Sequence, residues 1–230
     1  MLNAMGWLAE ASPALRAEIA RPCDQITVRE ARMLYHVGDP AGGIFCITAG
    51  RLEMHLHRWG SEHSLGHICG PGWWIGDLAA ISGGPRRFDV WVQGDTRLLR
   101  LSRAEIARIC DLHPEMHRHL LIMTTQNMRL LIDAVEVLGF FDPVRRVAAC
   151  LARVDNSSPG WDGRLIMTQG ELAHIAKLSR RRTNAALQDL ETAGMVRLGY
   201  GVIALADRQA LARLVEGDGT TANAPTDDRG

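Results

Sequence analysis

The sequence has 230 residues, 47% of them apolar, and its 26 basic residues balance 26 acidic ones at a pI near 7.1. Collagen-like and mostly disordered chains are excluded, and there is room for one large domain or two modest ones. A chain-wide basic field is also excluded, so a nucleic-acid partner has to be bound by a local patch.

Targeting signals and cysteines predict a cytoplasmic protein. The first seven residues lack the cationic and apolar segments of a secretory signal. No run of about 18 apolar residues occurs, so we expect no membrane partner. The five cysteines are widely spaced and never form a Cys-x-x-Cys pair, which argues against a disulfide framework, a zinc site or a conventional iron–sulfur site.

The N-terminal half predicts a short helix followed by antiparallel β-structure. Ser12 followed by Pro13 is typical of a helix start, and we expect this helix to end at Ala20. Twelve of the 23 glycines then lie between Gly38 and Gly94, where they separate short apolar segments. Short strands broken at such intervals by glycine turns indicate a sandwich or barrel.

Residues 114–138 predict one long helix, because they contain no glycine and no internal proline. Apolar side chains follow one face at helical spacing, but Leu121, Ile122, Met128, Ile132 and Val135 add to the other faces. One contact does not bury that much apolar surface, so we expect a second copy of the chain to pack here. The expected dimer contacts are Leu120, Met123, Asn127, Leu130, Leu131, Ala134, Val137 and Leu138. The alternative is a core helix inside one domain.

A domain boundary is expected at residues 139–143, where Asp142 and Pro143 suit the start of a further helix. This divides the chain into an N-terminal domain at residues 1–113, the long helix at 114–139, a C-terminal domain at 140–216 and a flexible polar tail at 217–230.

The C-terminal domain contains two capped helices separated by a short turn. Thr168 and Glu171 have the spacing of a capping box, and Ser179 suits the start of a second helix that runs to about Ala193. This second helix is expected to bury Thr183, Ala186, Leu187 and Leu190. Such a pair, with arginines at the exposed start of the second helix, is typical of a helix-turn-helix. Two short apolar segments around Gly199 and Gly201 then predict a hairpin, so the module is expected to be winged.

Charge supports double-stranded DNA as the partner of this module. Residues 164–197 carry six basic and three acidic residues, which gives the local patch that the overall balance requires. The guanidinium groups of Arg180 and Arg181 can each donate two hydrogen bonds to guanine O6 and N7. The amide of Asn184 can pair with adenine. Residues better placed for phosphate contacts are Thr168, Gln169, Ser179 and Arg182. The alternative is a solvated helix face without a partner.

The chain resembles the Crp/Fnr superfamily, the catabolite activator protein and its relatives, over roughly residues 8–212. The resemblance rests on an ordered series of landmarks: Gly38-Asp39, Gly50-Arg51-Leu52, Pro71-Gly72, Gly76-Asp77-Leu78, Arg87, His113-Pro114, Phe140-Phe141-Asp142, and residues 168–190. It implies an α+β fold: an antiparallel, cyclic-nucleotide-binding-like β-roll as sensor domain, a dimerisation helix and a C-terminal winged helix-turn-helix. It also implies a homodimer on palindromic promoter sites and RNA polymerase as a partner, reached through loops such as residues 155–163.

The expected effector pocket comprises Gly76, Asp77, Leu78, Arg87, Phe88, Leu131 and Ile132. In cyclic-AMP-binding members of the superfamily the pocket motif reads Gly-Glu-Leu and ends Arg-Ser/Thr-Ala, and a Thr-Ser pair on the long helix bonds the purine. Here Asp77, with a shorter side chain, occupies the position of the glutamate. Phe88 and Asp89 occupy the positions of the Ser/Thr and the alanine that end the motif, and Leu131 and Ile132 occupy those of the Thr-Ser pair. A purine amine that meets hydrocarbon costs about 1 to 3 kcal/mol, so control by cyclic AMP is not expected.

Several alternatives remain open at this stage. The pocket takes another anionic ligand or a cyclic nucleotide, or it is vestigial and Asp89 neutralises Arg87. Haem or a metal ion is a weaker alternative, with ligands available among His55, His57, His63, His67, Cys110, His113, His117 and His119. We expect no bound cofactor.

Two further departures from the family pattern concern the helix-turn-helix. Arg181 and Ala185 replace a glutamate and an arginine of the usual recognition helix, so more contacts to guanine are expected. Lys177 occupies the usual glycine of the turn, at a cost of about 1 kcal/mol if the backbone is left-handed there. No motif of a known catalytic scaffold occurs, so we do not expect an enzyme.

Overall fold

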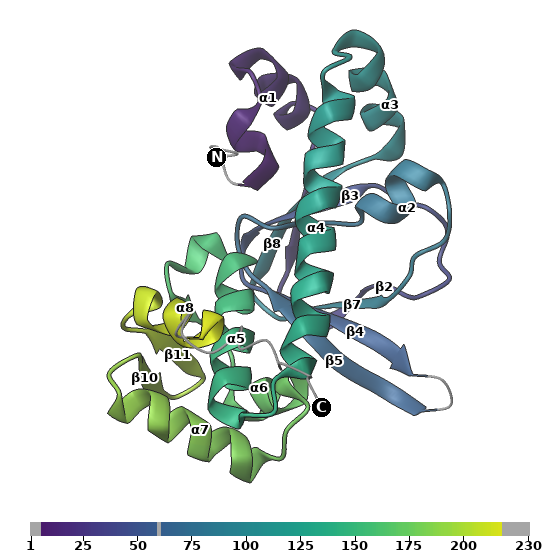
Figure 1. Ribbon diagram of the computed structural model, residues 1–230. Coiled ribbons are helices and arrows are strands. Elements are labelled where there is room, and N and C mark those ends of the chain that lie inside the picture. Colours follow the sequence, from purple (N-terminus) through teal and green to yellow (C-terminus); the bar gives the residue numbers. More distant parts are fainter. Residues whose placement is uncertain (1–5, 59–60, 218–230) are drawn as a thin grey trace, which may run out of the picture.

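The computed structural model describes residues 6–58 and 61–217, and the statements below refer to these residues. The N-terminal domain is a β-roll, the long helix α4 (Met116–Gly139) runs along it, and the C-terminal domain is helical with a small sheet (Figure 1). The α+β class and the order of its parts confirm the prediction.

The chain begins with the 3-10 helix η1 (Gly6–Glu10) and helix α1 (Pro13–Ala20). The Ser12 hydroxyl accepts a hydrogen bond from Leu15 N–H at 3.1 Å, and Pro13 occupies the first turn. Both ends of this predicted helix are confirmed.

The β-roll consists of two four-stranded antiparallel sheets. One sheet has the order β1 (Asp24–Val28), β8 (Thr96–Leu101), β3 (Ile44–Ala49) and β6 (Trp74–Ile75). The other has the order β2 (Arg32–Tyr35), β7 (Asp89–Val92), β4 (Leu52–Arg58) and β5 (Ser61–Cys69). Their facing side chains, among them Ile47, Leu52, Val90 and Leu98, form one apolar cluster. The predicted antiparallel architecture is therefore confirmed.

Two short helices connect the β-roll to α4. Helix α2 (Asp77–Ser82) lies between β6 and β7, and α3 (Arg103–Leu112) leads into α4 beside the first turns of that helix (Figure 1). Helix α4 begins two residues later than predicted, because His113 and Pro114 form the turn after α3 and Glu115 precedes the first helical residue. It ends at Gly139, the last residue of the expected helix at 114–139.

The C-terminal domain consists of α5 (Pro143–Asn156), the 3-10 turn η2 (Pro159–Trp161), α6 (Gln169–Ala176), α7 (Arg180–Thr192) and α8 (Arg208–Glu216), with three short strands. The carboxylate of Asp142 caps α5 as predicted, accepting bonds from Val144 N–H and Arg145 N–H, both at 3.1 Å. Of the predicted tail at residues 217–230, Gly217 caps α8 and the remainder lies outside the described residues.

The two domains share one core. Leu65 and Ile68 of β5 belong to the same apolar cluster as Val147, Leu151 and the buried side chains of α6 and α7. Polar contacts surround this cluster, including Gly160 N–H to Pro71 O at 2.9 Å and Gly70 N–H to Ser157 O at 3.2 Å. The β-roll and the C-terminal domain therefore pack directly against each other.

Candidate functional site

Helices α6 and α7 form the predicted pair, and each is capped as the sequence indicates. Thr168 Oγ1 accepts from Glu171 N–H at 3.1 Å, and Glu171 Oε2 accepts from Thr168 N–H at 2.6 Å, which completes the capping box. Ser179 Oγ accepts from Arg182 N–H at 3.3 Å at the start of α7. These caps fix the backbone at the start of both helices.

The Glu171 carboxylate also connects the helix pair to the β-roll. Arg51, in the turn before β4, donates from Nη2 to Glu171 Oε1 and from Nη1 to Ile166 O at 3.0 Å. Burial alone acts to raise the pKa of Glu171, but the hydrogen bonds from Arg51 and Thr168 outweigh it and the pKa is lowered. Glu171 therefore stays charged and keeps both contacts at neutral pH.

The faces of α7 divide as predicted. Thr183, Ala186, Leu187 and Leu190 are buried against α5 and α6, whereas the predicted base-reading residues Arg180, Arg181 and Asn184 are exposed. Of the predicted phosphate contacts, Thr168, Ser179 and Arg182 are exposed and Gln169 is half-buried. Within the described part of the chain, none of the three adjacent arginines forms an ion pair with a carboxylate. Their charges therefore point to solvent from the first turn of α7.

The predicted hairpin is present. A third strand, which sequence reasoning missed, pairs with one of its edges. Strands β10 (Val196–Gly199) and β11 (Val202–Leu205) pair around a turn in which Tyr200 is fully exposed. Strand β9 (Arg164–Leu165) pairs with the other edge of β11. Two residues of β-structure carry too little pattern to be recognised in a sequence.

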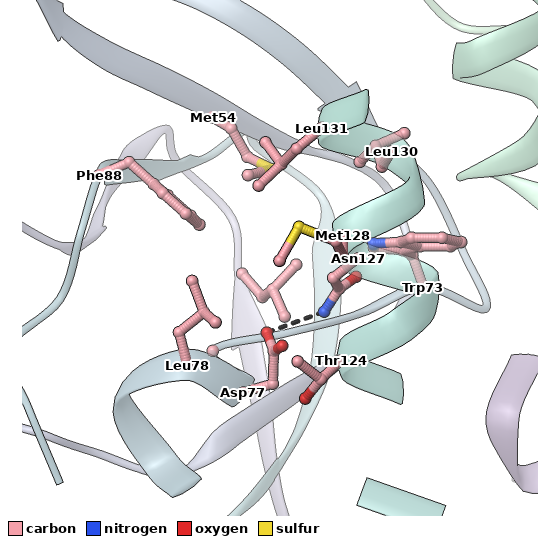
Figure 2. Close-up of a pocket in the computed structure, with 12 residues that line it drawn as sticks. Met54, Trp73, Asp77, Leu78, Phe88, Thr124, Asn127, Met128, Leu130 and Leu131 are labelled. Atoms are coloured by element: carbon pink, nitrogen blue, oxygen red, sulfur yellow. Dashed lines mark hydrogen bonds between the residues drawn. The ribbon is translucent and has the colours of Figure 1, made fainter. Parts of the chain in front are cut away.

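A cavity that is partly open to solvent lies between the β-roll and α4 (Figure 2). Five of the predicted pocket residues line it: Gly76, Asp77, Leu78, Phe88 and Leu131. Ile132 does not line it, because its side chain is on the exposed side of α4. Sequence reasoning missed Met54, Trp73, Ile75, Thr124, Asn127, Met128 and Leu130, which come from four different elements or turns.

A smaller cavity adjoins the first, and it contains two arginines with different surroundings. Arg87, the predicted pocket cation, lines this cavity with an exposed side chain. Arg86 is the buried cation: it donates from Nη1 to Gly76 O at 3.1 Å and from Nη2 to Gly43 O at 2.9 Å, and it stacks over the Tyr35 ring. Gly76 has a φ of 94°, and a Cβ there would lie 2.7 Å from Arg86 Nη1, so this position requires glycine.

Asp89, proposed above as a neutralising partner of Arg87, contacts a different part of the roll. Its buried carboxylate accepts a hydrogen bond from Val37 N–H at 2.7 Å and lies 3.8 Å from His36 Nδ1. The carboxylate thus holds the loop after β2 against β7.

The predicted dimer residues divide between the two sides of α4. Leu120, Met123, Leu130 and Val137 are buried within their own chain, and Asn127 bonds to Asp77, so these five face the β-roll or the C-terminal domain. Leu131 and Leu138 are exposed, and Ala134 is half-exposed. Four more apolar side chains of α4 are exposed, namely Leu121, Met128, Ile132 and Val135, which were expected on the other faces of the helix and not among the dimer contacts.

The haem and metal alternative gains nothing from the described residues. No group of three His, Cys, Asp or Glu side chains converges among them, and both His67, with Nε2 2.7 Å from Ser157 Oγ, and His119, beside the Trp7 ring, are buried. The side chains of His57 and His63 lie outside the described set.

None of the described helices is long and apolar enough to cross a membrane.

Comparison with known proteins agrees with this architecture. The cyclic nucleotide-binding domain profile matches residues 25–113, and the Crp-like helix-turn-helix domain profile matches residues 145–214. The chain is 23% identical over 206 residues to the CRP-like cAMP-activated global transcriptional regulator of Mycobacterium tuberculosis, which covers 87% of this chain and 92% of that protein. It is 24% identical over 189 residues to the cyclic AMP receptor protein of Thermus thermophilus, with coverages of 82% and 86%.

A solved structure has the same fold. The structure of FixK2 from Bradyrhizobium japonicum superposes with a TM-score of 0.69 at 22% identity, over 84% of this chain and 96% of that one. A cyclic-nucleotide-binding-type β-roll, a long helix and a DNA-binding winged helix-turn-helix together define a two-domain transcription regulator. The chain belongs to the Crp/Fnr superfamily of such regulators.

Proposed function

We propose that this protein is a homodimeric regulator that binds palindromic promoter DNA in the cytoplasm without needing cyclic AMP and without catalysing a reaction. The observation that carries the proposal is the first turn of α7. Its capped start places Arg180, Arg181 and Arg182 in solvent, with no carboxylate partner among the described residues. Three unpaired cations at the exposed start of a recognition helix favour a polyanion that presents guanine edges.

The residues of the helix pair divide into two roles. Arg180 and Arg181 are adjacent in the first turn of α7, Asn184 follows about one helical turn later, and the three read base edges in the major groove. Thr168, Gln169, Ser179 and Arg182 contact phosphates and fix the register of the protein on the duplex. The first group therefore determines sequence preference, and the second determines affinity and salt dependence.

The exposed side of α4 supports the dimer. Leu121, Met128 and Val135 recur every seven residues, with Ile132 and Leu138 beside them, and all five are at least half-exposed. A repeat of seven residues is the pattern of a two-helix seam, so a second copy of α4 is the fitting partner. Two recognition helices related by this seam would meet half-sites about one turn of DNA, roughly 34 Å, apart.

The pocket supports independence from cyclic AMP. Two relatives carry cyclic AMP in their names, but the large cavity of this chain is lined mainly by apolar side chains, with Asp77, Thr124 and Asn127 as polar groups and without a cation. A cyclic phosphate would therefore have to depend on the smaller cavity, where both amino groups of Arg86 already bond to carbonyl oxygens and Arg87, with an exposed side chain, is the other cation of the lining. RNA polymerase is the further partner we propose, through the exposed residues of segment 155–163, among them Asn156, Pro159 and Asp162.

The test is selection of binding sites from random duplex DNA by the purified protein without added ligand. We expect a two-fold palindrome. Failure without ligand but recovery in cell extract would show that an effector is required and would overturn the independence of DNA binding from a ligand. Failure in both would overturn DNA recognition by α7.

Single substitutions then separate the two roles. On the selected site and on scrambled DNA, Arg180→Ala and Arg181→Ala should lose about 1 to 3 kcal/mol of preference for the selected site. Gln169→Ala should weaken binding to both duplexes alike. Arg32→Ala, which removes an exposed arginine from β2, is the matched control and should change neither. Equal losses on both duplexes for all three α6 and α7 variants would contradict the assignment of roles.

A further inference from the structure

Phe141, in the turn between α4 and α5, presents its aromatic ring to solvent. This residue is 98% exposed, whereas its neighbour Phe140 is half-buried and packs against the core of the C-terminal domain. The turn joins the long helix to that domain (Figure 1). Scattered apolar side chains are common on protein surfaces, but a fully exposed ring that continues a larger apolar surface marks an interaction site.

The turn that carries this ring has a defined shape. Arg146 of α5 donates from Nε to Phe140 O at 2.8 Å and from Nη2 to Leu138 O at 3.3 Å. The Arg145 guanidinium lies over the Phe140 ring, 4.4 Å from its centre. These contacts satisfy carbonyl groups that the end of α4 leaves without partners in the helix. Two arginines of α5 therefore fix the backbone next to Phe141, while its own ring contacts solvent.

The Phe141 ring continues the side of α4 that we propose for the second copy. Val135 and Leu138, six and three residues earlier, are 72% and 50% exposed. The exposed apolar surface thus extends beyond the helix into the turn. In a two-fold dimer the same surface of each chain meets itself, so both turns lie at the same end of the seam.

Gly139, the last residue of α4, leaves a position without a side chain on this surface. It follows Ile132 by seven residues and Val135 by four, which is the spacing of residues on one side of a helix. Gly139 is exposed, and a Cβ atom added to it would have no neighbour within 4 Å. The seam therefore ends in open space beside a ring that its own chain does not cover.

We infer that Phe141 of each copy packs over Gly139 of the other copy and so fixes the two C-terminal domains relative to each other. A second copy fits because the contact is self-complementary: two-fold symmetry makes both Phe141–Gly139 contacts at once. Packed helices lie about 8 to 10 Å apart, and a glycine lets the ring approach the backbone closely. The inference rests on the proposed dimer and adds a contact outside its helix seam.

This contact would influence which DNA sites the dimer selects. Helix α5 directly follows the turn, and its Leu151 shares an apolar cluster with Leu187 of α7. A turn fixed against the other copy therefore fixes the separation of the two recognition helices. The dimer then prefers half-sites at one spacing.

The first experiment is photocross-linking of the full-length protein, with p-benzoylphenylalanine in place of one residue. At position 141 it should give a covalent dimer, attached within residues 135–143 of the other copy. At position 121, where Leu121 is 63% exposed near the other end of the seam, it reports the association of α4 alone. At position 112, where Leu112 is 60% exposed at the end of α3, it should give no dimer.

Two substitutions test the position that receives the ring. Gly139 does not have a positive φ, so larger residues fit its backbone. Gly139→Leu should occupy the space of the ring and reduce cross-linking from position 141 by about tenfold or more, because the ring is no longer buried. Cross-linking from position 121 should persist. Gly139→Ala adds a single carbon and is the matched control, which should retain more of the cross-link.

The effect on DNA is measured with Phe141→Ala. Binding is compared on the selected palindrome and on the same palindrome lengthened by one base pair between its half-sites. The preference for the selected spacing should fall by about tenfold or more, as expected when a buried aromatic contact is lost. Leu112→Ala removes an equally apolar side chain away from the seam and should keep the preference.

Each outcome bears on a different part of the inference. If position 121 cross-links and position 141 does not, the dimer stands and the Phe141 contact is wrong. The contact is also wrong if position 141 attaches outside residues 135–143, or if Gly139→Leu and Gly139→Ala reduce cross-linking equally. If neither position gives a dimer, the proposed dimer and this contact fail together. An unchanged spacing preference in Phe141→Ala would overturn the role in site selection. Because cross-linking needs no DNA, it tests the contact even if no palindrome is recovered.

Discussion

Lys177, in the turn between α6 and α7, has the backbone conformation that glycine adopts most easily. Its φ of 53° and ψ of 41° are left-handed, where a Cβ atom costs roughly 1 to 2 kcal/mol. Its ammonium group donates to Ser64 Oγ at 2.6 Å and to Leu65 O at 3.4 Å, so this residue also connects the turn to β5. The lysine thus combines an unfavourable backbone with a contact between domains.

Comparing two substitutions at Lys177 separates these effects. Lys177→Gly and Lys177→Ala both remove the ammonium contacts, but only glycine adopts the left-handed backbone without strain. We therefore expect the glycine variant to unfold with a free energy about 1 kcal/mol higher than that of the alanine variant. Urea unfolding at one protein concentration measures the difference. Equal stability would show that the turn rearranges in the alanine variant.

Arg86 and Arg87 show how far single residues can be predicted. Local rules identified the caps at Ser12, Thr168 and Ser179 correctly, because a cap depends on residues three positions apart in the sequence. The family resemblance selected Arg87 as the pocket cation, and the structure places Arg87 with an exposed side chain in the smaller cavity and buries its neighbour Arg86 there. Which of two adjacent side chains turns inward depends on how β7 begins, and that is set by its pairing with β2 and β4.

At the scale of elements, α4 was predicted as a helix almost to the residue, but its sides were assigned incorrectly in part. Its apolar side chains surround most of the helix, so periodicity alone cannot distinguish the side that packs on its own domain from the side left for a partner. The structure uses Leu120, Met123 and Val137 for two of its own clusters. Leu121, Met128 and Val135 are left exposed, and they form the seam proposed for the second copy.

A charge on this seam should separate the dimer. Val135 is 72% exposed in the single chain, so Val135→Glu has little effect on the folded protomer. In the dimer two carboxylates would be buried without partners, which should cost about 3 kcal/mol or more and raise the dissociation constant at least roughly a hundredfold. Sedimentation equilibrium measures this change.

The control for this variant is Leu112→Glu. Leu112 is 60% exposed at the end of α3, away from the seam, so the same charge there should leave the dimer intact. If both variants dissociate, or if neither does, the two copies associate through another surface.

At the scale of the whole molecule, the contacts between the domains were the least predictable part. Arg51 bonds to Glu171 across 120 residues of sequence, and His67 to Ser157 across 90. No local pattern indicates such pairs, and the sequence analysis considered His67 only as a metal ligand. The structure gives it another place: it lies between β5 and the end of α5, with Nε2 2.7 Å from Ser157 Oγ.

This position of His67, in the contact between the two domains, predicts that the stability of the folded protein depends on pH. Burial, with the nearby Arg153 guanidinium, holds the pKa of His67 well below its usual range, so the folded protein keeps this imidazole neutral. The unfolded chain takes up the proton near pH 6.5, and the folded chain does not. The free energy of unfolding should therefore fall as the pH drops below about 6.5, with a slope approaching 1.4 kcal/mol per pH unit from this one group.

Urea unfolding between pH 7 and pH 5 tests this dependence by comparing two glutamine variants at one protein concentration. His67→Gln should be less stable at pH 7, because it loses the bond to Ser157, but its stability should fall less steeply with acid than that of the natural chain. His174→Gln, at an exposed position on α6, should keep the steep dependence. Carboxylates titrate alike in all three proteins, so the difference in slope isolates the histidine. If His67→Gln and the natural chain have the same slope, protonation of His67 does not control how the β-roll holds the DNA-binding domain.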